Sequence, residues 1–420
     1  MRLAAIALVV LLQVFSISAA EPWPEFRGPH GDGRSSAKNL PLTWSEKENV
    51  RWKTPIEGRA WSSPVVWGDQ IWLSNATPDG KRLSGICVEA TSGKIIRNLL
   101  LFEIAKPQPR HSFNSYASPT PTIDAEHVYL HFGSSGTACL DRTTGAVVWQ
   151  RQDLPCDHLR GPGSSPILWN DFLILTFDGV DYQYLVALDK RTGETIWKTD
   201  RKIDYGADKN SNGDFKKGYS TPSVREIAGV PTLVSVSAAA TVAYDARDGK
   251  ELWRAQTGGY NSGCRPLFLH DLVIGNSEDG MQLFAIRTQG RGDVTSSNIA
   301  WTYARSAPAR SSPLVVGDLV FAMSNEGVLS CLDGKTGKAI WQKRLEGDYS
   351  ASALYADGRI YYCSQDGLTT VIAADREFKK LSENQLDEGF MASPAVIDEA
   401  LILRTRTHLY RIEVGQSESR

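Results

Sequence analysis

The chain has little net charge and, after its N-terminus, no long hydrophobic run. No later stretch approaches the roughly 20 apolar residues that a helix needs to cross a bilayer. The 46 Lys and Arg residues nearly balance the 48 Asp and Glu residues, which gives a formal net charge of -2. Proteins that bind polyanions usually carry a basic excess or a basic stripe. The sequence therefore predicts no nucleic acid partner and no membrane span in the mature chain.

Familiar catalytic motifs are also missing. The 7 His residues are scattered along the chain and form no H-E-x-x-H pair. The sequence contains neither the G-x-S-x-G turn that exposes a nucleophilic serine nor the glycine-rich loop that cradles phosphate groups. These absences predict no catalytic residues and no metal centre of these types.

The 6 cysteines form no C-x-x-C pair, no C-x-x-C-H haem motif and no adjacent Cys-Cys pair. Cys87, Cys139 and Cys331 occupy equivalent positions in three copies of a repeat described below. Such positions predict small hydrophobic residues on separate buried strands, too far apart to bridge. Cys156 and Cys264 lie in predicted loops, and the sequence leaves open whether they pair.

The N-terminus has the features of a targeting segment. Arg2 precedes an apolar run that ends at Phe15, and small residues at Ser18 and Ala20 suit a signal peptidase. We therefore expect residues 1–20 to be a signal peptide cleaved after Ala20, which places the mature protein in the periplasm or outside the cell. An uncleaved anchor is the alternative. No cysteine lies near the cleavage site, so a lipid anchor is not predicted.

A D-x-x-x-G-x-x-x-W pattern occurs four times, beginning at Asp141, Asp189, Asp245 and Asp333. An aspartate side chain can accept hydrogen bonds from N–H groups two or three residues on, as in an Asx-turn. Glycine supplies a positive φ in a hairpin turn. Tryptophan on an outer strand can cover the junction between neighbouring sheets. The pattern therefore predicts a structural unit rather than a catalytic one.

A second signal, a small residue followed by proline, opens an apolar run at the start of each unit. We place the openings at Ser63-Pro64, Ser118-Pro119, Ser165-Pro166, Thr221-Pro222, Ser312-Pro313 and Ser393-Pro394, with degenerate copies at Arg265-Pro266 and Ser352-Ala353. Their spacing of roughly 40 to 56 residues is typical of propeller blades.

Each unit contains four short alternating runs, and the last unit stops after three. The segment Asn49 to Ile56, which carries Trp52, can supply the missing strand and leave no free edge. We therefore predict an all-β, eight-bladed β-propeller with four-stranded blades, closed by the N-terminal strand; seven blades is the alternative. The propeller is expected to span residues 46–415, with a lead segment over residues 21–45 and a tail over residues 416–420.

The motifs ALDKRTGETIW and LDGKTGKAIW resemble the tryptophan-docking repeat of the pyrroloquinoline quinone (PQQ) propeller family, and the resemblance extends from about Trp52 to Glu413. The lead WPEFRGPHGDG, Trp23 to Gly33, resembles segments that precede such propellers in exported bacterial proteins. One branch of the family, the quinoprotein dehydrogenases, binds PQQ with Ca²⁺ and oxidises alcohols or sugars. Another branch, typified by the outer-membrane assembly factor BamB, is non-catalytic and holds partner proteins.

The chain resembles the BamB branch more, because quinoprotein dehydrogenases are usually longer and commonly carry an adjacent cysteine pair that is missing here. The resemblance implies a non-catalytic, monomeric binding platform for an envelope protein or a small extracellular ligand, with no cofactor. The alternative is a PQQ-dependent oxidoreductase that uses PQQ with Ca²⁺.

In a propeller, the loops before each first strand gather around one end of the central channel. Aromatic and basic residues in these loops can stack against and clamp a planar or carboxylate-bearing ligand. The candidates are Arg59, Trp61, Tyr116, Arg160, Lys217, Tyr219, Arg265 and Arg310. The alternative interpretation is that the aromatic residues pack the inner barrel and the basic residues are solvated.

The longest loop, residues 203–220, contains a partial calcium-binding pattern in Asp208, Asn210, Asn212 and Asp214. A calcium loop needs a bidentate glutamate at its twelfth position, and here that position holds Tyr219. A polar surface loop is therefore the preferred interpretation, with a calcium site as the alternative.

Overall fold

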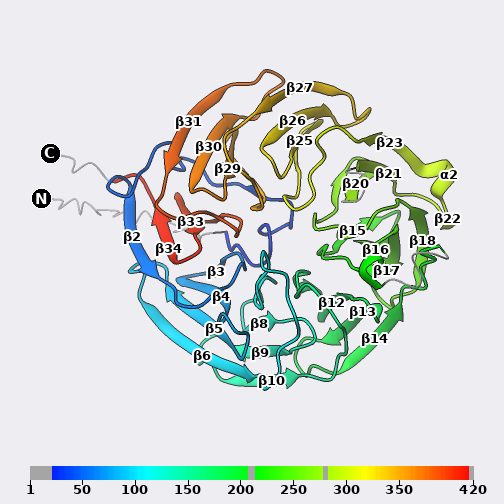
Figure 1. The fold of residues 1–420 in the computed structure, drawn as a ribbon, viewed down its shortest axis with the longest axis horizontal. Helices are drawn as coiled ribbons and strands as arrows, with labels where there is room; N and C mark the ends of the chain where they lie inside the picture. Colours follow the sequence, from blue (N-terminus) through cyan, green and yellow to red (C-terminus); the bar gives the residue numbers. More distant parts are fainter. Residues whose placement is uncertain (1–20, 207–212, 278–281, 416–420) are drawn as a thin grey trace, which may run out of the picture.

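A computed structural model describes residues 21–206, 213–277 and 282–415 and consists almost entirely of β-strands. Eight sheets stand side by side in a ring around a central channel (Figure 1). The predicted eight-bladed propeller is confirmed, and the seven-bladed alternative is wrong.

The first four blades follow one another along the chain. Blade 1 contains β3 (Val65–Trp67), β4 (Gln70–Ala76), β5 (Arg82–Glu89) and β6 (Ile95–Glu103). Blade 2 contains β7 (Thr122–Ile123), β8 (His127–His131), β9 (Thr137–Asp141) and β10 (Val147–Arg151). Blade 3 contains β11 (Ile167–Trp169), β12 (Phe172–Asp178), β13 (Gln183–Asp189) and β14 (Thr195–Asp200). Blade 4 contains β15 (Ser223–Ile227), β16 (Val230–Val236), β17 (Ala240–Asp245) and β18 (Glu251–Gln256).

The remaining blades complete the circle. Blade 5 contains β19 (Leu267–Leu269), β20 (Leu272–Ser277), β21 (Gln282–Arg287) and β23 (Ile299–Tyr303). Blade 6 contains β24 (Leu314–Val316), β25 (Leu319–Met323), β26 (Val328–Asp333) and β27 (Ala339–Arg344). Blade 7 contains β28 (Leu354–Ala356), β29 (Arg359–Cys363), β30 (Leu368–Ala373) and β31 (Lys380–Gln385). Blade 8 contains β32 (Ala395–Ile397), β33 (Ala400–Arg404), β34 (His408–Ile412) and β2 (Val50–Pro55).

Two blades gain an extra parallel strand. β22 (Gly292–Asp293) lies on the outer edge of β18, and β1 (Arg34–Ser35) lies beside β28 at the channel. Two short helices, η1 (Gly213–Lys216) and α2 (Thr295–Asn298), interrupt the loops.

The ring closes as predicted, because β2 pairs antiparallel with β34. Trp52 on β2 then reaches across to blade 1, where its indole N–H donates a hydrogen bond to the carbonyl of Ala90 at 2.9 Å. Blade 8 is therefore joined to blade 1 by an indole-to-carbonyl hydrogen bond of the same kind as the one that Trp149 makes between blades 2 and 3.

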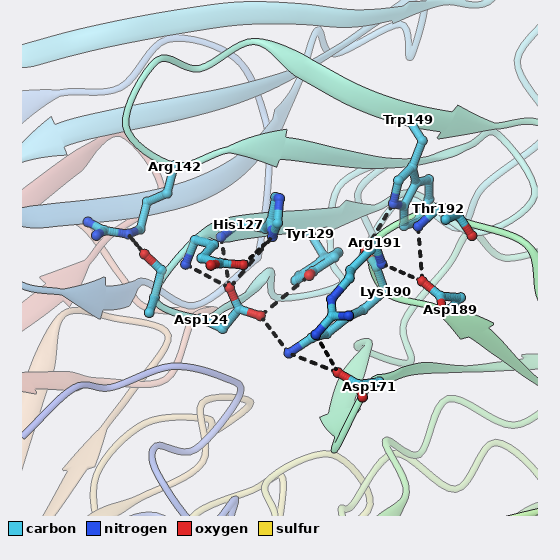
Figure 2. Close-up of polar contacts among 12 residues, drawn as sticks. Asp124, His127, Tyr129, Arg142, Trp149, Asp171, Asp189, Lys190, Arg191 and Thr192 are labelled. Atoms are coloured by element: carbon cyan, nitrogen blue, oxygen red, sulfur yellow. Dashed lines mark hydrogen bonds and ion pairs between the residues drawn. The ribbon is translucent and has the colours of Figure 1, made fainter.

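The junction between blades 2 and 3 shows how the repeat works (Figure 2). The Asp189 carboxylate accepts hydrogen bonds from the backbone N–H groups of Arg191 and Thr192. Gly193 ends the turn with a φ of 76°, a conformation that glycine tolerates best. Trp149 of blade 2 packs on this turn and donates its indole N–H to the Lys190 carbonyl at 3.0 Å. The predicted roles of aspartate, glycine and tryptophan are all confirmed.

One junction uses a different residue. Arg97 on β6 stands where the pattern has tryptophan, and its guanidinium donates hydrogen bonds to the carbonyls of Thr143 and Thr144 in blade 2. Its side chain also lies over Gly145, as the indole does elsewhere. At this junction a guanidinium group thus takes the place of the indole ring and makes the hydrogen bonds to the neighbouring turn.

Charged residues beside the Trp149 junction tie the same two blades together (Figure 2). The Lys190 ammonium lies 3.2 Å from Asp124 of blade 2 and 4.0 Å from Asp171 of blade 3. Asp171 also pairs with Arg191, and Tyr129 donates its hydroxyl to Asp124. Because these charges have partners within the protein, we infer that the cluster stabilises the contact between blades 2 and 3 and does not bind a ligand.

All six cysteines are buried, and none is joined in a disulfide. Cys87, Cys139 and Cys331 lie on the third strands of blades 1, 2 and 6, as predicted. Cys156 and Cys264, whose pairing the sequence left open, are not bridged, because Cys156 packs between blades 2 and 3 whereas Cys264 lies near the channel beside Ser220 and Ser311.

Candidate functional site

A ring of hydroxyl groups surrounds the central channel. In seven of the eight blades, a Ser or Thr immediately precedes the Pro or Ala that opens the first strand, and its hydroxyl accepts a backbone N–H from the preceding blade at 2.9–3.0 Å. The members are Ser63, Thr120, Ser165, Thr221, Ser312, Ser352 and Ser393. Arg265 takes the eighth position, where it donates its N–H to Ser312 but offers no hydroxyl.

This ring corrects the predicted start of blade 2. Thr120 takes part in the ring, so the blade opens at Thr120-Pro121 and not at Ser118-Pro119. The sequence prediction chose the wrong one of two adjacent Ser/Thr-Pro pairs, because both fit the same local pattern. Consequently Ser118, not Tyr116, occupies the position three residues before the proline. Tyr116 packs against Gly80 and the Arg110 guanidinium instead.

With the register corrected, that position three residues before each opening lines one pocket in all eight blades. The residues are Trp61, Ser118, Gly163, Tyr219, Gly263, Arg310, Ser350 and Met391. The pocket lies at one end of the channel, which we call the mouth, and has a volume of about 280 Å³. That volume is close to the lower end of the range seen for small-molecule sites.

The lead segment closes the channel from the opposite side. Trp23 exchanges backbone hydrogen bonds with Val66, and the Pro24 carbonyl accepts the N–H of Ile123. Phe26 follows and lines the same pocket. Figure 1 shows this dark blue segment in the middle of the ring. The sequence placed the segment ahead of the propeller, but nothing in its composition showed that it enters the channel.

Buried arginines hold the lead segment in place. Arg265 donates to the Phe26 carbonyl and pairs with Glu25 at 3.0 Å. Arg27 is buried and donates to the carbonyls of Pro313 and Asp32. Burial lowers the pKa of Arg27 to about 10. Arg265 therefore faces the lead segment, and its predicted place at the mouth is wrong.

The long connection between β6 and β7 covers part of the mouth. Phe113 at its tip lines the pocket, and the carbonyl of Phe113 accepts the indole N–H of Trp61 at 2.9 Å. Arg310 reaches across from blade 6, with its guanidinium carbon 4.1 Å from the centre of the Phe113 ring. Aromatic and guanidinium groups from distant blades therefore meet above the pocket.

Four of the eight candidates line the pocket: Trp61, Arg160, Tyr219 and Arg310. Arg59 lies beside it, with its guanidinium carbon 5.2 Å from the Trp61 ring centre. Lys217 is buried and binds Asp214, so it does not reach the mouth. Sequence reasoning missed Phe26 and Phe113, because neither lies at a fixed distance from a strand opening.

Of the partial calcium pattern, Asp208, Asn210 and Asn212 lie outside the described residues. Asp214 is described, and its carboxylate pairs with Arg160 at 2.9 Å and with Lys217. Among the residues that the structure describes, no group of three His, Cys, Asp or Glu side chains could hold a metal ion. These contacts of Asp214 favour the polar-loop interpretation.

Two buried histidines lie near the mouth but do not face it. His158 accepts the backbone N–H of Ser134, and His131 shares a 2.8 Å hydrogen bond with Thr137. Burial lowers the pKa of His158 to about 4 and that of His131 to about 3. Both imidazoles are therefore neutral at physiological pH, and these two residues contribute to packing rather than to proton transfer.

The pocket wall combines aromatic, hydroxyl and cationic side chains. The part of the wall that the structure describes contains Phe26, Trp61 and Phe113 together with Arg160 and Arg310, but no aspartate or glutamate. Asn261 also lines the pocket, and its buried carbonyl oxygen has no hydrogen-bond partner. The aromatic rings can hold an apolar group, and Arg310 can attract a negative charge, whereas Arg160 is already paired with Asp214.

Comparison with known proteins agrees with this architecture. A model of the family described as outer membrane protein assembly factor BamB matches residues 181–420, more than half of the chain. The chain belongs to this family. BamB from Bordetella pertussis is 22% identical over 360 residues, which cover 82% of this chain and 84% of that protein.

Solved structures share the fold of this BamB-family protein. BamB from Moraxella catarrhalis superposes with a TM-score of 0.59 at 14% identity and covers 86% of this chain and 99% of that one. A europium-containing methanol dehydrogenase gives a TM-score of 0.68 at 10% identity and covers 93% of this chain and 90% of that one. At these identities the likeness shows the propeller fold alone.

Proposed function

We propose that this protein is a non-catalytic platform in the cell envelope that holds protein partners during outer-membrane protein assembly. Membership of the BamB family supports the assembly role, and so does the similarity to BamB from Bordetella pertussis over 82% of the chain. The observation that carries the proposal for the site is the mouth, where Trp61, Phe113 and Arg310 from three separate loops present an apolar and cationic surface.

An envelope location fits the predicted signal peptide, whose residues lie outside those described. In the described part of the chain, no helix is long and apolar enough to cross a membrane. We propose that the mature protein works in the periplasm and meets its partners through the loops at the mouth.

In the test, the mature protein carries a C-terminal tag and is cross-linked to its partners inside cells of the organism that produces it. Outer-membrane assembly proteins should co-purify with the wild-type protein. Trp61→Ala combined with Arg310→Ala should reduce their recovery by roughly 10-fold, because aromatic and Arg residues dominate binding energies. A matched variant on the opposite face, Lys335→Ala, should retain them. Recovery of no envelope protein with the wild-type chain would overturn the proposal.

A PQQ-dependent oxidoreductase is the alternative function. Arg160 and Arg310 could face the carboxylates of a quinone. Calcium, however, prefers carboxylate and carbonyl oxygen ligands, and the described wall of the pocket has no aspartate or glutamate. The residues present therefore do not fit a calcium-held quinone. Titration of the mature protein with PQQ and Ca²⁺ tests this: tight binding together with dye-linked alcohol or sugar oxidation would replace the platform by an enzyme.

A further inference from the structure

Three arginines converge beside the mouth from three different loops. Arg59 precedes Trp61, Arg110 lies in the β6–β7 connection, and Arg406 lies in the β33–β34 turn. The backbone N–H of Ile56 donates to the Thr407 carbonyl at 2.8 Å, which brings the first and last of these loops together. The guanidinium of Arg59 in turn donates to the Ser112 carbonyl of the β6–β7 connection. We call Arg59, Arg110 and Arg406 the arginine triad.

The triad contains uncompensated positive charge. Several exposed arginines of this protein pair with a carboxylate, as Arg82 does with Glu103 and Arg191 with Asp171. In the described residues, no carboxylate oxygen lies within the 4.0 Å ion-pair distance of any triad member. The pKa of Arg59 is lowered by burial and then by the charges of Arg110 and Arg406. Like charges placed together without a counter-charge cost free energy unless a ligand neutralises them.

Two members of the triad, Arg59 and Arg110, are also held in place before any ligand binds. Arg110 donates to the carbonyl of Asn114 at 2.9 Å and to that of Pro78 at 3.3 Å. The Nε atoms of Arg59 and Arg110 are buried and have no hydrogen-bond partner. Guanidinium groups that are already fixed are suited to bind a carboxylate, because less side-chain freedom is lost on binding.

Trp61 connects the triad to the channel pocket. Its ring contacts the Arg59 guanidinium and also lines the pocket. An anionic group on the triad would therefore have directly beside it a cavity of about 280 Å³, whose wall combines the rings of Phe26, Trp61 and Phe113 with hydroxyl groups. Phe26 closes the far side of that cavity, so it has room for a side chain but no path for a long acyl chain.

We propose that the arginine triad and the pocket form one site for an acidic segment of a protein partner, with a carboxylate on the triad and a neighbouring aromatic side chain in the pocket. This inference rests on the proposed platform function and names the chemistry of its partner. The closed pocket favours a peptide over a phospholipid, whose headgroup would meet the same arginines.

The experiment uses the mature protein and the peptide acetyl-Gly-Asp-Glu-Phe-Gly-amide, with binding measured by calorimetry. We expect binding that weakens at least ~10-fold in Arg59→Gln/Arg406→Gln, because both residues contact the anion. Matched peptides with Asn-Gln in place of Asp-Glu, or Ala in place of Phe, should bind as weakly to the wild-type protein. The control variant Arg344→Gln/Arg376→Gln loses the same charge from β27 and from the β30–β31 turn, and should bind the acidic peptide normally.

A second measurement separates a ligand site from a structural one. Thermal unfolding without peptide should show an equal or higher Tm for Arg59→Gln/Arg406→Gln, because the substitutions relieve repulsion. A lower Tm would assign the arginines to the fold and overturn the site. So would equal binding of the neutral peptide, or no binding of the acidic one at about 5 mM, which is weaker than ordinary specific recognition.

Two further outcomes bear on the kind of partner. Triad-dependent binding to phosphatidylglycerol vesicles with no peptide binding would overturn the peptide in favour of a lipid, and equally strong competition by inorganic phosphate would reduce the site to a simple anion site.

If envelope partners co-purify equally with Arg59→Gln/Arg406→Gln, the site is wrong while the platform stands. If no partner co-purifies with the wild-type chain but the peptide binds, the platform is wrong while the site stands.

Discussion

The indole ring of Trp149 lies against Gly193 of the next blade so closely that a Cβ on the glycine would come within 2.7 Å of it. Trp52, Trp197 and Trp301 lie in the same way against Gly93, Gly249 and Gly337. The repeat therefore keeps glycine for two reasons, namely the positive φ of the turn and the space that the neighbouring tryptophan occupies. The two residues of this pair belong to different blades although they recur together in the sequence.

Gly193→Ala should destabilise the protein by about 3 kcal/mol, because strain at positive φ adds to displacement of the indole. Gly229→Ala is the matched control: its φ of 77° is nearly the same as the 76° of Gly193, and nothing lies within 4 Å of its Cβ position. The control should lose only about 1 kcal/mol. Urea denaturation measures both, and equal losses would contradict the contact.

Thr120→Val should cost about 1–3 kcal/mol, the penalty for a buried donor without an acceptor. The substitution keeps the shape of the side chain but removes the hydroxyl that accepts the N–H of Ser63 at 2.9 Å. Thr120→Ser keeps the hydroxyl and should cost less. Hydrogen exchange should show faster exchange of the Ser63 amide in the valine variant alone; unchanged protection there would argue against the hydroxyl ring.

Glu25→Ala should destabilise the protein by roughly 3–5 kcal/mol, because it leaves the buried Arg265 guanidinium without its counter-charge. The two side chains are 13% and 4% exposed, so solvent screens them little. Asp357→Asn removes an exposed pair with Lys38 and should change little. Urea denaturation gives the comparison, and limited proteolysis should detect earlier release of the lead segment in Glu25→Ala.

Stability should fall as the pH drops below about 6.5, the ordinary pKa of histidine. The folded-state pKa values of His131 and His158 are lowered by burial to about 3 and about 4. Between these values and 6.5 the unfolded chain binds protons that the folded chain does not, which favours unfolding by up to ~1.4 kcal/mol per pH unit for each residue.

Burial also raises the pKa of the Glu25 and Asp178 carboxyl groups, so the histidine contribution is isolated by substitution rather than by the choice of pH window. His131→Asn combined with His158→Gln should flatten the slope of stability against pH between about pH 6.5 and 5, whatever the change in absolute stability. An unchanged slope in the double variant would contradict the buried neutral state.

Much of the fold could be predicted because its signals are local and repeated. Asp189, Gly193 and Trp197 lie within one hairpin, so their spacing is written directly in the sequence, although Trp197 contacts the next blade. The closing strand was also predictable, since a unit with three strands leaves an edge that Trp52 and its neighbours can fill. The start of blade 2 was not, because Ser118-Pro119 and Thr120-Pro121 are locally equivalent and only contact with the neighbouring blades chooses between them.

The candidate site depends on contacts that no local pattern records. The sequence by itself determined that loops from all eight blades would meet at one end of the channel, because a closed ring of equal units allows no other arrangement. Only the tertiary structure decided that Phe26 closes the pocket, that Arg265 turns toward Glu25, and that Arg59 meets Arg406 from the far end of the chain. These pairings join residues separated by up to most of the chain, and packing in three dimensions sets them.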